Sequence, residues 1–190
     1  CGFIRVDSEQ GIETRYPLLD RVTIGRERCC KEYLLRENTT NFNWNKLYKS
    51  EIFSDVCFPE LKYSEDYVVN VQAFLKCEVK VTISDCFCYY CVRPDSVTSQ
   101  EFNNSKLEII TAGEMALSFI QRKSPELASL AAAYLLDYGM WLHQKMLNSN
   151  YYSRENERLI IKSYRKAFRI KYQKDDLGIN KLLKNMRGIV

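Results

Sequence analysis

Polar and apolar residues alternate at the start of the chain, as they do in a half-buried strand. Residues 2–7 follow this alternation and end in a turn-prone segment, 7–11. A second short strand is predicted over 21–24. A helix is predicted next, over 26–37, and the polar run 38–41 ends it.

The middle of the chain carries both helical and strand periods. A short helix is predicted over 45–53, and Ser64 is a favourable N-cap for a helix over 64–76. Two strand-like segments follow, 79–83 and 86–92. Because only two turn-forming residues separate these segments, we expect them to form a hairpin.

The period is helical throughout after about residue 102, and four helices are predicted, over 103–122, 125–147, 153–172 and 177–186. The second of these carries a broad apolar stripe, which is most simply the core of a helical bundle. We therefore expect an α+β chain, with strands and helices in residues 1–102 and a helical region with a basic tail in residues 103–190.

Composition limits the class of protein. The chain has 190 residues, of which 46% are hydrophobic and 27% charged, enough to bury a core. No apolar run approaches the roughly 18 residues of a membrane-spanning helix, so we expect a soluble protein. Residue 1 is Cys, and a strand begins immediately after it, so we also expect this sequence to be a piece of a longer chain.

Cysteine and histidine content argues against metal and disulfide chemistry. The eight Cys residues lack the spacing of a secreted disulfide framework, and most lie in apolar runs, so we expect buried free thiols in a reducing compartment. Cys88 and Cys91 form a CxxC, but on a strand they face opposite sides. The only His is His143, in a helical segment, and we expect it to be a core or surface residue rather than a ligand.

Charge is concentrated at the C-terminal end. Residues 151–190 hold 11 Lys plus Arg against 4 Asp plus Glu, a net charge of +7, and aromatic residues are interleaved with them. Such a segment suits an anionic membrane surface, or it is a solvated face of a bundle. The whole chain has a net charge of only +4, which argues against a dedicated nucleic-acid binder.

Four motifs follow one another in a distinctive order: Trp44-Asn45-Lys46-Leu47-Tyr48, then Phe58-Pro59-Glu60, then Glu65-Asp66 at a helix start, and finally Tyr89-Tyr90-Cys91-Val92-Arg93-Pro94-Asp95-Ser96-Val97-Thr98. The combination resembles the second half of a family 2 glycosyltransferase of the GT-A type, over roughly residues 1–100. The resemblance implies that residues 1–102 are the acceptor-side half of a GT-A domain. It leaves the helical region outside the match.

The resemblance also implies a reaction and its residues. A sugar would pass, with inversion, from a nucleotide diphosphate sugar to an acceptor hydroxyl on a glycan or lipid-linked molecule, in surface polysaccharide or glycolipid synthesis. Asp66 would be the general base, with Glu65 beside it, because the attacking hydroxyl must lose its proton as the bond forms. A divalent metal, Mn²⁺ or Mg²⁺, would assist in the full-length enzyme.

The expected substrate-binding residues lie in two places. Trp44, Asn45, Lys46 and Tyr48 would line the acceptor or diphosphate side, and Arg93 and Ser96 could reach a phosphate after the last strand. The alternative is that Trp44 is a core residue, Lys46 is solvated and the turn after Arg93 needs no ligand.

One expected motif is missing. No D-x-D motif, which would hold the metal, occurs in the sequence, and the similar Asp7-Ser8-Glu9 is interpreted as a surface turn. We therefore expect this piece to hold no metal and to be inactive by itself. The expected location is the cytoplasm, peripheral at the inner face of the membrane. The competing hypothesis is a helical membrane-surface or protein-interaction module without catalysis.

Overall fold

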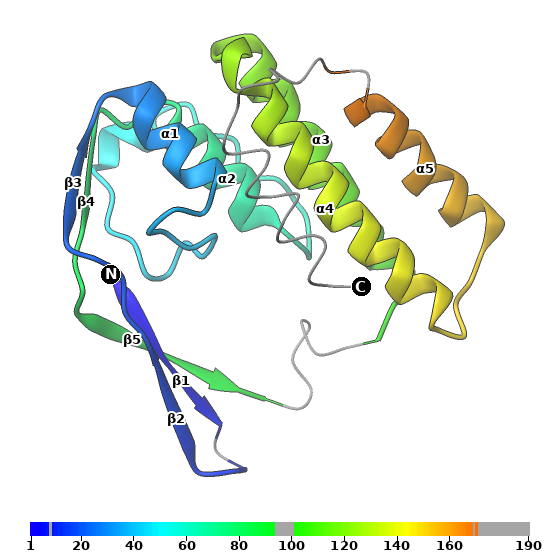
Figure 1. Ribbon diagram of the computed structural model, residues 1–190, viewed down its shortest axis with the longest axis horizontal. Helices are drawn as coiled ribbons and strands as arrows, with labels where there is room; N and C mark the ends of the chain where they lie inside the picture. Colours follow the sequence, from blue (N-terminus) through cyan, green and yellow to red (C-terminus); the bar gives the residue numbers. More distant parts are fainter. Residues whose placement is uncertain (8, 94–100, 169, 171–190) are drawn as a thin grey trace.

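The computed structural model describes residues 1–7, 9–93, 101–168 and 170. It is an α+β structure in which two small sheets lie on one side and the helices on the other (Figure 1). The expected α+β class is confirmed in this coarse form. Of the predicted elements, the helix over 177–186 lies outside the described residues.

The first sheet contains three strands: β1 (Gly2–Asp7), β2 (Ile12–Tyr16) and β5 (Cys86–Val92), in the order β2-β1-β5. β1 pairs antiparallel with β2 and parallel with β5. Asp7 Oδ1 accepts a hydrogen bond from the Gln10 backbone N–H at 3.1 Å, so Asp7 stabilises the turn between β1 and β2. This agrees with the interpretation of the D-x-E segment as a surface turn.

The second sheet pairs β3 (Arg21–Ile24) antiparallel with β4 (Val79–Thr82). The expected hairpin of residues 79–83 with 86–92 is therefore wrong, because β4 and β5 belong to different sheets. Asp20 accepts hydrogen bonds from the backbone N–H of Ser84 at 2.7 Å and from its hydroxyl at 3.1 Å. This contact fixes the point where the chain leaves one sheet for the other.

Two α-helices come from the N-terminal half, α1 (Arg26–Leu34) and α2 (Glu65–Phe74). The predicted helix over 26–37 ends early because Arg36 and Asn38 adopt left-handed φ angles of 53° and 51°. The predicted helix over 45–53 is reduced to the 3₁₀ turn η1 (Ser50–Phe53).

Three long helices follow: α3 (Glu108–Lys123), α4 (Ala128–Leu147) and α5 (Arg154–Phe168), with short 3₁₀ turns η2 (Asn104–Leu107) and η3 (Pro125–Leu127) before α3 and α4. Their positions agree with the helices predicted over 103–122, 125–147 and 153–172, although residues 169, 171 and 172 of the last lie outside the described residues. Among the described helices, none has the length and apolar character needed to cross a membrane.

A single cluster of buried apolar side chains runs through α1, α2, α3, α4 and α5. Tyrosines join the two halves of the chain within it. Tyr33 and Tyr67 stack at a centroid distance of 6.1 Å, and Tyr67 in turn stacks on Tyr134 of α4. Arg36 lies over the ring of Tyr134, 5.6 Å from its centroid. The cluster holds α2, which carries the candidate catalytic pair, against the helical region.

All eight cysteines are described, and none forms a disulfide. The expectation of buried thiols is right for Cys29 and Cys30, and burial raises the pKa of Cys30 to about 12. It is wrong for Cys57 and Cys91, which are exposed.

Candidate active site

Asp66 lies in the first turn of α2, two residues after a strained residue, Ser64. Ser64 occupies the N-cap position as predicted, but its φ of 61° is left-handed, and its side chain makes no capping hydrogen bond. Its side chain instead hydrogen-bonds Tyr134. Non-glycine residues in this backbone region are often held there by function, so the position of this strain directly before Glu65 and Asp66 is informative.

The Asp66 carboxylate receives hydrogen bonds from both the backbone and the side chain of Asn43. Burial raises its pKa, while Asn43 and the positive charge of Lys46 act in the opposite direction and leave a net increase. Burial also raises the pKa of Glu65, with smaller contributions from the nearby Asp66 and Glu108. A carboxylate with a raised pKa accepts a proton more readily than an ordinary one, and the contacts with Asn43 hold it in position.

Asn70, one helical turn after Asp66, organises the loop that carries Asn43. Its side chain is fully buried, and Nδ2 donates to Asn43 Oδ1 at 2.6 Å and to the Asn41 backbone oxygen at 2.8 Å. Its Oδ1 accepts a hydrogen bond from the Tyr48 hydroxyl. Asn70 therefore fixes the amide that holds Asp66, and Tyr48 fixes Asn70.

Lys46 stabilises the same loop through hydrogen bonds from its ammonium group to backbone oxygens of the loop. Its Nζ donates to the backbone oxygen of Thr40 at 2.8 Å and to that of Phe42 at 2.5 Å. Burial lowers the pKa of Lys46 to about 8, against the opposing effect of Asp66. Its ammonium group is directed into the loop, so Lys46 supports the site rather than offering a free cation to a diphosphate.

Asn45 and Trp44 take opposite environments. Asn45 is buried, and its Nδ2 donates to the Cys1 backbone oxygen at 2.8 Å. Trp44 is 41% exposed and stacks on Phe42 and on Tyr90, with centroid distances of 4.8 and 5.9 Å. Of these two residues, Trp44 is the one that presents an accessible flat surface, as a sugar-binding residue requires.

A cavity of about 870 Å³ lies between the 38–52 loop, the end of α2, β4 and the start of β5. It is mostly apolar in character, with side chains such as Ile52, Phe74 and Phe87 in its wall. The residues predicted to bind substrate that line it are Trp44, Asn45, Lys46 and Tyr48. Asp66 and Glu65 do not line it, so the structure brings Asp66 to the loop but not to the cavity.

The remaining predicted site residues are separate from Asp66 or outside the description. Arg93 is exposed just after β5. Ser96 lies outside the described residues. The sequence reasoning missed Asn43 and Asn70, although a signal for Asn70 existed: an amide side chain is unfavourable inside an apolar helix unless it has a partner, and it is four residues after Asp66.

The divalent cation implied by the resemblance finds no site in the part of the chain that the structure describes. No three His, Cys, Asp or Glu side chains come together there as a group that could hold a metal. Asp66 is already hydrogen-bonded to Asn43, and the Asp7 carboxylate to its own turn. The side chains of the described residues therefore do not form a site that fits a divalent metal.

Comparison of the chain with protein-family models, with curated proteins and with solved structures found no match.

Proposed function

We propose that this chain is the acceptor-side half of an inverting glycosyltransferase of the GT-A type, acting on a nucleotide diphosphate sugar and an acceptor hydroxyl. One observation carries the proposal. The loop of the W-N-K-L-Y motif and the helix start of the E-D motif, which are separate in the sequence, meet at one carboxylate through Asn43. The contact supports the proposal because it joins two motifs that resemble the family by their order in the sequence.

Asp66 acts in this proposal as the general base. The acceptor oxygen attacks the anomeric carbon from the side opposite the diphosphate, the bond to the diphosphate oxygen breaks, and the acceptor proton passes to the Asp66 carboxylate. Its raised pKa makes the proton transfer more favourable, and Asn43 keeps the carboxylate oriented.

Trp44 supplies the sugar-facing surface of the proposal. Its partly exposed ring is held in place by Phe42 and Tyr90, so a pyranose can stack on it without reordering the loop. The exposed Arg93 is the cation proposed to meet a phosphate, because the Lys46 ammonium group is engaged in its own loop. The location proposed for the enzyme is the cytoplasm, at the inner face of the membrane.

The test is a transfer assay on the complete natural protein with a panel of sugar nucleotides and either Mg²⁺ or Mn²⁺. Asp66→Asn should lower turnover by about 10² to 10⁴-fold, because the side chain keeps its shape but no longer accepts a proton. Asp85→Asn is the matched control, since Asp85 is exposed and the change is chemically identical. Retained turnover in Asp66→Asn would refute the assignment of the base, and the absence of any transfer would favour the non-catalytic interaction module.

A further inference from the structure

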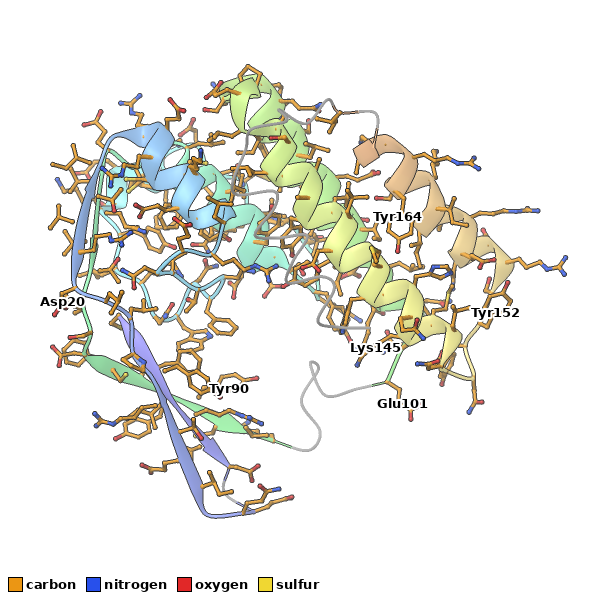
Figure 2. All side chains as sticks on the ribbon, in the orientation of Figure 1. Asp20, Tyr90, Glu101, Lys145, Tyr152 and Tyr164 are labelled. Carbon is orange, nitrogen blue, oxygen red and sulfur yellow. The ribbon has the colours of Figure 1, made fainter. Side chains whose placement is uncertain are left out.

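Helix α5 has two faces of opposite character. Its inner face packs on α4 through Ile160 and Ala167, both fully buried, and Tyr164 lies against Gly139. Its outer face carries long side chains with nitrogen ends that project away from α4 (Figure 2). These contacts fix the rotation of α5 about its axis and so determine which of its residues face the solvent.

Four exposed cations form a stripe on this outer face: Arg154, Arg158, Lys162 and Arg165. At 3.6 residues per turn they lie within roughly 80° of the helix circumference, centred opposite Ile160 and Ala167. Arg154 interacts with Tyr152 and Glu157, but Arg158, Lys162 and Arg165 form no ion pair with any described residue. The stripe therefore has positive charge that the protein does not neutralise.

Exposed apolar and aromatic side chains lie on α5 and in the segment that precedes it. Leu159 is on α5 itself and is 48% exposed, and Tyr151, just before the helix, is 57% exposed. Leu147, at the end of α4, and Tyr152 are also among the exposed large hydrophobic residues. Cations next to exposed Leu and Tyr suit the interface between lipid headgroups and acyl chains, where charges meet anionic headgroups and the rings and Leu enter below them.

We propose that the outer face of α5 binds an anionic membrane surface, with Arg158, Lys162 and Arg165 at the headgroups and Leu159 and Tyr151 inserted beside them. Charge complementarity selects this partner over a neutral one. The exposed apolar side chains favour a lipid surface over a polynucleotide, because a phosphate backbone offers no apolar surface for Leu159 to contact. The proposal does not depend on the transfer reaction, since binding is measured without substrate.

The experiment is cosedimentation of the full chain with phosphatidylserine-containing vesicles and with neutral phosphatidylcholine vesicles. Binding to the anionic vesicles is expected to fall as ionic strength rises from about 0.05 M to about 0.5 M. The triple variant Arg158→Gln, Lys162→Gln, Arg165→Gln should lose about 100-fold in partition, at roughly fivefold per cation. Leu159→Ser should lose about fivefold with the charge unchanged.

The control variant removes the same charge elsewhere. Lys31, Lys62 and Lys123 are exposed on other elements, so changing all three to Gln should leave vesicle binding near that of the wild type. Three results would overturn the proposal: equal binding of the wild type and the stripe variant, equal binding to neutral vesicles, or a loss in the control triple equal to that in the stripe triple. Competition by duplex DNA at the same charge concentration, with no effect of Leu159→Ser, would also overturn it and indicate a general polyanion surface.

Discussion

Asn43 donates hydrogen bonds to the Asp66 carboxylate through both its backbone and its side chain. Asn70 orients the same side chain by donating to Asn43 Oδ1 at 2.6 Å. Asn43 therefore holds the Asp66 carboxylate, and Asn70 holds the Asn43 side chain. The position of the carboxylate depends on these two uncharged residues. This dependence leads to the first prediction.

Asn43→Ala should raise the pKa of Asp66 further. The variant removes a hydrogen bond to the charged form, and such bonds contribute about 1.5–3 kcal/mol, so an upward move of about one pH unit is expected. Carbon-detected NMR titration of the Asp66 carboxyl measures the change directly and needs no substrate. An unchanged midpoint would mean that the Asn43 side chain does not hold the carboxylate, and Asn41→Ala serves as the control.

Asp66→Asn should stabilise the fold at neutral pH. Burial raises the native pKa of Asp66 above its ordinary value of 3.8, so the native state binds the proton more tightly than the unfolded chain does. The stability that this group supports is present below 3.8 and declines as pH rises through the native pKa. Urea unfolding should therefore show the variant to be the more stable at pH 7, with a smaller difference at pH 3.5.

The buried carboxylate of Glu32 should behave in the opposite way. Burial acts to raise its pKa, but the ammonium group of Lys80 and the hydrogen bond from Thr23 outweigh that effect and leave the pKa below 4.5. Its contribution to stability is therefore present above pH 4.5 and is lost as pH falls through the native pKa. Lys80→Met removes the partner at 2.5 Å but leaves Arg21 and Arg28 beside Glu32, so it should cost about 1–3 kcal/mol at pH 7 and less in acid.

Matched exposed charges provide the control for Glu32. Arg26 and Glu78 also join α1 to the start of β4, at 2.5 Å, but both side chains are more than 60% exposed, at 64% and 69%. Arg26→Gln should leave the urea midpoint unchanged because solvent screens the pair. If Arg26→Gln and Lys80→Met lowered the midpoint equally, burial would not be what makes the Glu32 pair important.

Gly139→Ala should weaken the packing of α5 on α4. A Cβ at position 139 would lie 2.6 Å from Tyr164 Cε1, so either the ring or the helix must shift, at a cost of about 1–3 kcal/mol. The measurement is a double-mutant cycle in urea. Gly139→Ala should cost nothing in a chain that already carries Tyr164→Ala, and an equal cost in both backgrounds would contradict the contact.

The helices were predictable from sequence because their signal is local. The stripe in 125–147 and the acidic start at Glu65 and Asp66 each define a helix without reference to the rest of the chain. The strand pairing was not predictable in this way. β4 and β5 are adjacent in sequence and both alternate, yet their partners, β3 and β1, come from the first residues of the chain. β2 was missed because all five of its residues are exposed.

The candidate site was predictable only in its outline. The order of the motifs pointed to Asp66, and in the structure residues of the 41–48 loop lie next to it. The roles within that loop depend on side-chain direction, which no spacing encodes. Lys46 and Tyr48 were both expected to line the acceptor or diphosphate side. Both line the cavity, but the Lys46 ammonium donates to Thr40 and Phe42 and the Tyr48 hydroxyl donates to Asn70.

The parallel pairing of β1 with β5 has a consequence for the order of folding. The two strands lie at opposite ends of the segment that contains α1 and α2, so their contacts form only after a long loop has closed, and loop closure opposes them entropically. The tyrosine contacts between α2 and α4 have a lower entropic cost of loop closure, because α3 packs on both of these helices and brings them together. The helical side of the molecule should therefore condense first and the pairing of β1 with β5 last, so that the amides hydrogen-bonded across this pair gain protection from hydrogen exchange late in refolding.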